Sequence, residues 1–355
     1  MQSLSRVCAI TALFFLTSPT HAISAPQEPP PLVGHLDADN PLVGRIFDGG
    51  TGAEVPLDEA LNRARRSEVI LLGERHDNPD HHALQAYALG ELIASGRRPA
   101  LVFEMIDGDQ GEALDTWRAA TTPDTGDLNA LLSWESRGWP SFSWYEPLFA
   151  QALKENLPIF PGNPPRTQVH AISLGETPDS VTTLGLLDNP LPDPLASDLL
   201  DTLRDSHCGM IPESDLSPIA LAQRAKDATM AQAVVAALTG GAESVMIITG
   251  SEHARTDRGV PFYLPKGLSH LSIAFVEAFE GETDPLAYGE AKVVTDGTPP
   301  YDLLWFTPRI ERRDPCEGLA EHFKDQEEAT PPPNDESQTR SAPQRESIPA
   351  NPPHP

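Results

Sequence analysis

The sequence predicts an α/β protein with a mainly parallel sheet flanked by helices, with helical insertions and a disordered C-terminal tail. Two observations predict this fold class. Short apolar runs of strand length recur along the chain, and segments with helical apolar periodicity lie between them. Strands that alternate with helices are typical of a parallel sheet that is covered on both faces.

The predicted strands are six short apolar runs. They span Val69–Leu72, Ala100–Phe103, Leu157–Phe160, Val245–Thr249, Leu271–Phe275 and Leu303–Phe306. The predicted helices span His82–Ser95, Tyr145–Glu155 and Leu221–Leu238. The first helix places Leu84, Ala88 and Leu92 on one stripe, which gives it an apolar face toward the sheet.

The first 25 residues have the order of a secretory signal peptide. A positive charge at Arg6 precedes the apolar run Cys8–Leu16, and small residues precede possible cleavage sites after Ala22 or Ala25. The run is too short to span a bilayer as a mature helix. Since no cysteine stands at a cleavage site, we expect a soluble periplasmic or secreted protein rather than a lipoprotein. An uncleaved anchor is the alternative.

Composition divides the chain into four segments. We predict a signal peptide at 1–25, a linker at 26–43, one α/β domain at 44–323 and a disordered, Pro-rich acidic tail at 324–355. The tail has almost no aliphatic residues. It therefore cannot bury enough apolar surface to offset the entropy lost on ordering.

The charge and the cysteines restrict the partners and the compartment. A net charge of -27 argues against nucleic acid, because phosphate binding needs a basic surface. Cleavage of the signal peptide would leave only Cys208 and Cys316, which could pair in an oxidising compartment. Two cysteines make neither a disulfide scaffold nor a metal motif at this spacing.

Polar, ionisable residues follow four of the predicted strands directly. These segments are Gly73–Asp77, Glu104-Met105, Gly162–Arg166 and Gly250–Arg255. In parallel α/β sheets, ligands bind outside the carboxyl ends of the strands. We therefore expect the four segments to converge on one crevice.

The residues expected in this crevice are two carboxylates and two imidazoles: Glu74, His76, Glu104 and His253. Carboxylate with imidazole binds a transition metal or performs general acid–base catalysis. The alternative is a structural network of buried polar groups in a non-catalytic interaction module. Convergence of four strand ends favours a functional site, because ionisable residues are seldom buried together without a partner or a task.

Other candidates carry weaker signals. His81 and Gln85 share a helix face and are predicted to support the crevice. The segment His207–Met210 is interpreted as an ordinary loop. Tyr87, Tyr145 and Tyr263 are phenols that could ligate ferric haem. The chain lacks a Walker A loop, a dinucleotide fingerprint, a nucleophile elbow and a His-Glu-x-x-His helix, which disfavours nucleotide enzymes and serine hydrolases.

An ordered set of motifs resembles the ChaN family, which shares a superfamily with Tiki-type proteases and erythromycin-esterase-like proteins. The resemblance covers roughly residues 46–308. Its motifs are Leu72–Asn78 with His81, His82 and Gln85; Phe103–Met105 with Gln110; Trp139 with Tyr145–Pro147; Gly162-Asn163 with Arg166; Ala225–Ala231; and Gly250–Arg255 with Gly259–Pro261.

This resemblance implies haem binding and iron acquisition at a bacterial envelope, with haem held between two subunits by tyrosine ligation. It also implies a homodimer and an outer-membrane haem receptor as partners. The chain departs from the family's frequent lipoprotein form, and the ligand tyrosine has no assigned position here. The cofactor-binding candidates are Arg75, Tyr145, Asn163, Arg166 and Arg255, with Arg258 as a further cation near the strand ends.

The alternative implied by the Tiki branch is a metal-dependent hydrolase, either a protease or an esterase. Glu74, His76, Glu104 and His253 would then hold a divalent metal and activate water.

Overall fold

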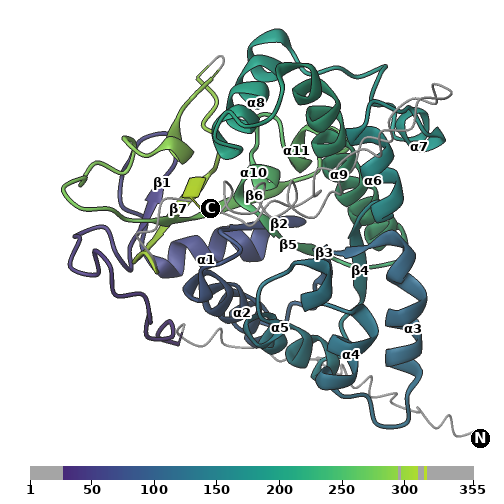
Figure 1. The fold of residues 1–355 in the computed structure, drawn as a ribbon. Helices are drawn as coiled ribbons and strands as arrows, with labels where there is room; N and C mark the ends of the chain where they lie inside the picture. The colour runs from purple at the N-terminus through teal and green to yellow at the C-terminus, as the bar shows by residue number, and fades with distance from the viewer. Residues whose placement is uncertain (1–26, 295–296, 311–315, 318–355) are drawn as a thin grey trace, which may run out of the picture.

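The computed structural model describes residues 27–294, 297–310 and 316–317. The predicted signal peptide, 1–25, and the predicted tail, 324–355, lie outside these residues. The described chain confirms the α/β fold, because helices cover both faces of a seven-stranded sheet (Figure 1). The strand order is β1-β7-β6-β2-β5-β3-β4, and among the strands of the described residues only the β1–β7 pair is antiparallel.

The strands are β1 (Ile46–Asp48), β2 (Val69–Glu74), β3 (Ala100–Asp107), β4 (Ile159–Asn163), β5 (Val245–Gly250), β6 (His270–Glu277) and β7 (Leu303–Thr307). The helices are α1 (Leu57–Arg66), α2 (Pro79–Ala94), α3 (Gly111–Ala119), α4 (Thr125–Leu132), α5 (Phe142–Lys154), α6 (Arg166–Ser173), α7 (Asp179–Thr183), α8 (Asp193–Ser206), α9 (Glu213–Thr239), α10 (Ser251–Ala254) and α11 (Val260–Tyr263).

All six predicted strands are confirmed, and each of them runs further toward its carboxyl end than its apolar run, while β4 begins at Ile159 rather than at Leu157. Strand β2 continues to Glu74, which pairs with Gly250 at the end of β5. Strand β3 continues to Asp107. Backbone pairing does not require apolar side chains, so a strand can extend into the polar residues of a site. The short antiparallel strand β1 was not predicted, because three residues are too few to show a pattern.

The sheet has two apolar faces because successive side chains of a strand point to opposite sides. Ile70 and Leu72 of β2 pack in a cluster with residues of α1, α2 and α5. Val69 and Leu71 pack in a second cluster with α9. Figure 1 shows α1, α2 and α5 on one side of the sheet and α8, α9 and α11 on the other.

Helices α6, α7 and α8 pack on α9, on one face of the sheet. They correspond to the helical insertions that the sequence predicts. Helices α6 and α7 pack on α9 in one small cluster, and α8 packs on α9 in another. A disulfide joins Cys208, in the α8–α9 loop, to Cys316, and thus confirms that these cysteines can pair. No helix among the described residues has the length and apolar character needed to cross a membrane.

Residues 27–43, expected as a linker, make defined contacts with the domain. The backbone N–H groups of Val33 and Gly34 donate to the Asp80 carboxylate at 2.7 and 2.9 Å. Asp37 pairs with Arg309 just after β7. The described part of this segment therefore lies along α2 and the end of β7.

Candidate functional site

A pocket of about 320 Å³ opens at the carboxyl ends of β2, β3 and β5. Its floor contains all four residues that the strand ends predicted: Glu74, His76, Glu104 and His253. The parallel register brings them together, since Glu74 pairs with Gly250 in the sheet and Phe103, just before Glu104, pairs with Ile248. Each of the four side chains is buried.

The Glu74 carboxylate is held by three side chains. His76 Nδ1 lies 2.7 Å from Oε1, and the Tyr145 hydroxyl donates to the same oxygen at 2.6 Å. His82 Nδ1 lies 3.1 Å from Oε2, while its Nε2 lies 2.9 Å from the His76 carbonyl oxygen. Both ring nitrogens of His82 thus face acceptors, which favours the imidazolium.

The pKa values in this half follow from burial and opposite charge. Burial alone would raise the pKa of Glu74, but the charge of His82 and the hydrogen bonds from His76 and His82 outweigh it and hold the pKa far below its usual range. Burial alone would lower the pKa of His82, but Glu74 outweighs it and raises that pKa. A buried carboxylate–imidazolium pair results.

The Glu104 carboxylate is held in the other half of the floor. Its Oε2 accepts from the Thr249 hydroxyl and from the Gly250 N–H, each at 2.8 Å. Its Oε1 lies 3.2 Å from His253 Nε2. His253 Nδ1 in turn lies 2.6 Å from Oδ1 of Asp227 on α9. The His253 ring is therefore fixed between two carboxylates.

This arrangement keeps a proton on His253. Burial alone would lower its pKa, but the Glu104 and Asp227 carboxylates outweigh burial and raise the pKa to about 10. Burial also works against ionisation of Glu104, yet the His253 charge holds the pKa of that carboxyl well below its usual range. We assign the shared proton to His253, because carboxylates face both of its ring nitrogens.

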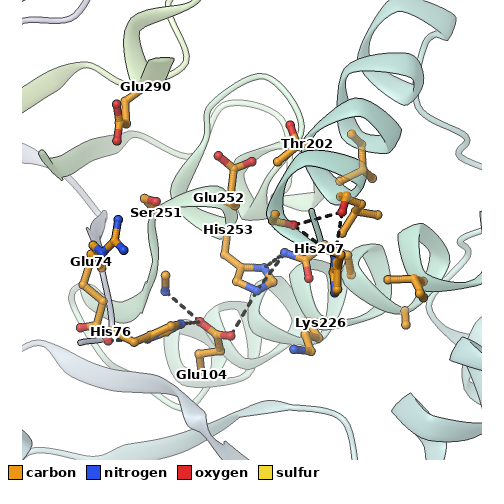
Figure 2. Close-up of a pocket in the computed structure, with 18 of the residues that line it drawn as sticks. Glu74, His76, Glu104, Thr202, His207, Lys226, Ser251, Glu252, His253 and Glu290 are labelled. Carbon is orange, nitrogen blue, oxygen red and sulfur yellow. Dashed lines mark hydrogen bonds and ion pairs between the residues drawn. The ribbon is translucent and has the colours of Figure 1, made fainter. Parts of the chain in front are cut away.

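The two halves form one alternating row of imidazoles and carboxylates beneath the pocket. Its members, in spatial order, are His82, Glu74, His76, Glu104, His253 and Asp227. The halves meet where His76 Nε2 lies 3.8 Å from Glu104 Oε2. Figure 2 shows His76, Glu104 and His253 in this sequence along the floor.

The described residues do not offer the arrangement of donor atoms that the predicted divalent metal would need. No group of three or more His, Cys, Asp or Glu side chains within these residues is placed to hold a metal ion. The physical reason is that the donor atoms are directed at one another. Glu104, for example, already receives a hydroxyl, a backbone N–H and an imidazole.

The pocket has an apolar wall opposite its polar floor. Helices α6, α8 and α9 and strand β6 supply this wall, which consists of Val169, Leu199, Leu203, Ile219, Ala222 and Phe275. His207 also lines the pocket, at the end of α8. Arg75, Lys226, Glu252, Glu277 and Glu290 add further charged groups to the lining.

Of the five predicted cofactor-binding residues, only Arg75 lines this pocket. Tyr145 is fully buried behind Glu74, and burial with the Glu74 charge raises the pKa of its phenol well above the usual range. Asn163 and Arg166 line a separate cavity of about 20 Å³. Arg255 is buried and paired with Asp257, so its charge is already neutralised.

The predicted supporting residues do support the turn after β2. His81 Nδ1 accepts from the Arg75 N–H at 2.8 Å, and its Nε2 lies 2.9 Å from the Thr307 hydroxyl. Burial lowers the pKa of His81 well below its usual range, so its ring is neutral. The Gln85 amide donates to the Leu72 carbonyl at 3.1 Å.

Sequence reasoning missed the roles of Asp227 and His207. Asp227 was noted only as part of a helix motif, although a charged pair, Lys226-Asp227, among the alanines of an apolar helix was a usable signal. His207 was interpreted as part of an ordinary loop. Its position next to Cys208 was the available signal, since a disulfide fixes the backbone beside it.

The comparisons with known proteins agree with this fold. The family profile described as "Haem-binding uptake, Tiki superfamily, ChaN" matches residues 60–264. The solved structure of cofacial haem binding to ChaN of Campylobacter jejuni is similar with a TM-score of 0.55 and 19% identity, over 73% of this chain and 95% of that chain. This likeness shows the fold alone.

Two further solved structures are more distant. The type III effector HopBA1 has a TM-score of 0.41 and 16% identity, over 76% of this chain and 99% of that one. A mutant of the erythromycin esterase EreC in its open conformation has a TM-score of 0.38 and 11% identity, over 65% and 76%. No curated protein matches the chain.

Proposed function

Because the chain belongs to the family of haem-binding uptake proteins, Tiki superfamily, ChaN, we propose that it is an exported protein that binds haem for haem or iron uptake at a bacterial envelope. Haem is the cargo in this proposal. The solved Campylobacter jejuni ChaN is described as binding haem cofacially. A homodimer and an outer-membrane haem receptor as partners are part of the same proposal.

The observation that carries the proposal is the division of the pocket into an apolar wall and a polar floor. A porphyrin ring is large and apolar, and the wall from α6, α8 and α9 offers aliphatic side chains to pack against it. Arg75, whose side chain is 39% exposed, is paired with Asp77 and Glu277, so a propionate would have to replace one of these carboxylates. The apolar wall therefore supports haem binding.

The pocket's size bears on the proposed dimer. A volume of about 320 Å³ is near the lower end of small-molecule sites, which range from about 300 to 1,000 Å³. Part of a haem bound here would extend beyond the pocket. A second subunit would cover that part and exclude water from it.

The disulfide supports the proposed export. Disulfides form and persist in oxidising compartments and are rare in the cytosol. The Cys208–Cys316 bond thus fits a periplasmic or secreted protein.

A haem titration with a pocket-filling variant tests the proposal. Ala222→Phe would place an aromatic ring in the pocket, because Ala222 is buried on its wall. Ala236→Phe is the matched control on the exposed side of the same helix. We expect saturable binding with a Soret shift in the wild type and the control, and a loss of at least about 10-fold in affinity for Ala222→Phe. Absence of saturable binding by the folded wild type would refute haem binding.

A second candidate, hydrolysis, is favoured by one specific observation. His76 donates through Nδ1 to Glu74, which orients the ring as a carboxylate orients a catalytic base. His253, protonated between Glu104 and Asp227, would offset the negative charge of these two carboxylates on the floor of the pocket. Water would be the nucleophile, and His76 would accept its proton.

The variant Glu104→Gln separates the two candidates. It removes the charge that holds the His253 proton, while the apolar wall is unchanged. If the protein is a hydrolase, turnover of ester and peptide substrates should fall by at least about 100-fold. If it only binds haem, there should be no turnover to lose, and haem affinity should stay within about threefold.

A further inference from the structure

A second, smaller cavity lies at the carboxyl ends of β3 and β4, where Asp107 pairs with Asn163 in the sheet. Its volume is about 20 Å³. This is room for one small group of a ligand and not for a whole ligand. Among the residues that line the cavity, three are cations, namely Arg137, Arg166 and Lys226, and Asp107 is the carboxylate.

Positive charge therefore exceeds negative charge in this cavity. Arg137 pairs with Asp107 through Nη1. Burial raises the pKa of Asp107, and the charges of Arg137 and Lys226 oppose this rise. Arg166 is exposed and forms no ion pair within the described chain. A cation is thus available for an anionic ligand, in a protein whose net charge is -27.

The position of Arg166 strengthens the preference for an anion. Helix α6 begins at Arg166, and Val169, which also lines the cavity, lies in the first turn. The partial positive charge at a helix N-terminus disfavours a cation there and favours an anion. An anion beside Arg166 would therefore be stabilised by the guanidinium and by the helix together.

The Asn163 side chain adds a hydrogen-bond acceptor that has no donor. The residue is 5% exposed and lines the cavity. Its Nδ2 donates to Asp107 Oδ1 at 3.4 Å, which fixes the orientation of the amide, because a carboxylate only accepts. No hydrogen bond from the described residues reaches Asn163 Oδ1. A buried polar atom without a partner is destabilising, so a ligand N–H or a water should complete it.

The small cavity adjoins the large pocket. Val169 and Lys226 line both of them. Figure 2 shows Lys226 on the side of the large pocket away from Glu74 and His76. A ligand whose end group occupies the small cavity can therefore extend along Val169 toward the apolar wall.

We propose that the small cavity binds the C-terminal carboxylate of a peptide. The carboxylate would pair with Arg166, with Arg137 and Lys226 adding positive charge. The amide N–H of the same terminal residue would donate to Asn163 Oδ1. A planar carboxylate matches the fork of a guanidinium and has fewer atoms than a phosphate, which suits a cavity of this size. The site does not depend on haem binding.

Isothermal titration calorimetry of the full-length protein tests the site with small probes. N-acetylglycine carries both the carboxylate and the adjacent N–H. Acetoxyacetate has an oxygen in place of that N–H, and N-acetylglycinamide lacks the carboxylate. We expect saturable binding of N-acetylglycine, binding of acetoxyacetate that is weaker by at least about fivefold, and no saturable binding of N-acetylglycinamide. Inorganic phosphate should bind more weakly than N-acetylglycine.

Two variants and a control assign the contacts. Arg166→Gln keeps an exposed polar side chain and should weaken binding of N-acetylglycine by at least about 10-fold. Asn163→Leu removes the acceptor, so N-acetylglycine and acetoxyacetate should bind it with equal affinity. Arg66→Gln is the matched control, because Arg66 is an exposed arginine at the end of α1, which packs on the other face of the sheet. It should bind N-acetylglycine like the wild type.

Each result supports or overturns the proposal. Equal affinity of the wild type for N-acetylglycine and acetoxyacetate, or no binding of either, would mean that water completes Asn163 and that no peptide terminus binds here. Tighter binding of inorganic phosphate would overturn the choice of a carboxylate. Equal losses for Arg166→Gln and Arg66→Gln would also refute the site. If Asn163→Leu does not fold, the probe comparison in the wild type and in Arg166→Gln decides.

Discussion

The imidazole of His253 is joined to Asp227 across 26 residues of sequence by a contact of 2.6 Å between Nδ1 and Oδ1. The contact links α10, which follows β5 directly, to the middle of α9. Glu104 holds the other ring nitrogen at 3.2 Å. The helix that covers one face of the sheet is thus bound to the floor of the pocket by charge as well as by apolar packing.

Removal of one charge from this contact should destabilise the protein. Asp227→Asn keeps the size of the side chain but removes the carboxylate that stabilises the His253 proton. Loss of one partner of a buried pair costs about 3 kcal/mol of unfolding free energy or more. Urea unfolding measures this loss. Asp205→Asn, on the exposed side of α8, should change stability by less than about 0.5 kcal/mol. A similar effect for both variants would contradict the prediction.

The same contact predicts that the unfolding free energy decreases at alkaline pH. The pKa of His253 is raised from 6.5 to about 10, so its protonated form favours the folded state. Its stabilising contribution should be complete below pH 6.5 and should disappear as the pH rises to about 10. Urea unfolding of the wild type and His253→Asn at several pH values measures the difference. A difference that stays constant from neutral pH to pH 10 would show that His253 is not the titrating group.

The Tyr145 side chain should stabilise the folded protein and should not bind the haem iron. Its hydroxyl donates to Glu74 at 2.6 Å, so Tyr145→Phe leaves a buried carboxylate with one donor fewer. We expect a loss of about 1–3 kcal/mol in unfolding free energy, with an unchanged haem spectrum. Tyr87→Phe is the control, since the Tyr87 hydroxyl makes an exposed hydrogen bond and should matter less. A changed haem spectrum for Tyr145→Phe would restore the tyrosine as a ligand.

The disulfide should stabilise the folded state. It closes a loop of 108 residues between Cys208 and Cys316. The double variant Cys208→Ser/Cys316→Ser should lose about 2–4 kcal/mol of unfolding free energy. A reducing agent should lower the stability of the wild type by a similar amount and leave the double variant unchanged. If reduction also destabilises the double variant, the effect has another origin.

A methyl group at Gly250 should disturb the floor of the pocket. A Cβ at this position would lie 2.9 Å from His76 Nε2 and 3.5 Å from Glu104 Oε2. Gly250→Ala should therefore displace the His76 ring and cost about 1–3 kcal/mol in stability. Gly289→Ala meets no atom within 4 Å and serves as the control. The melting temperatures of the two variants give the comparison, and equal values would argue against the close contact.

The sequence by itself determined the sheet and the place of the site. Apolar runs such as Val245–Thr249 identify buried strands, because the interior of a parallel sheet excludes polar side chains. Polar residues directly after these runs locate the pocket, because parallel strands end at one edge. Both inferences depend on local order in the chain, and for that reason they needed no coordinates.

Only the tertiary structure decided what each residue of the site does. It placed Tyr145 behind Glu74, paired Arg255 with Asp257, and turned Asp227 toward His253. It also brought His207 to the pocket from a loop that gave no functional motif. These roles depend on the direction of side chains and on distances of about 3 Å between packed elements. Residue type and spacing along the chain do not specify such distances, because they arise only when helices and strands pack together.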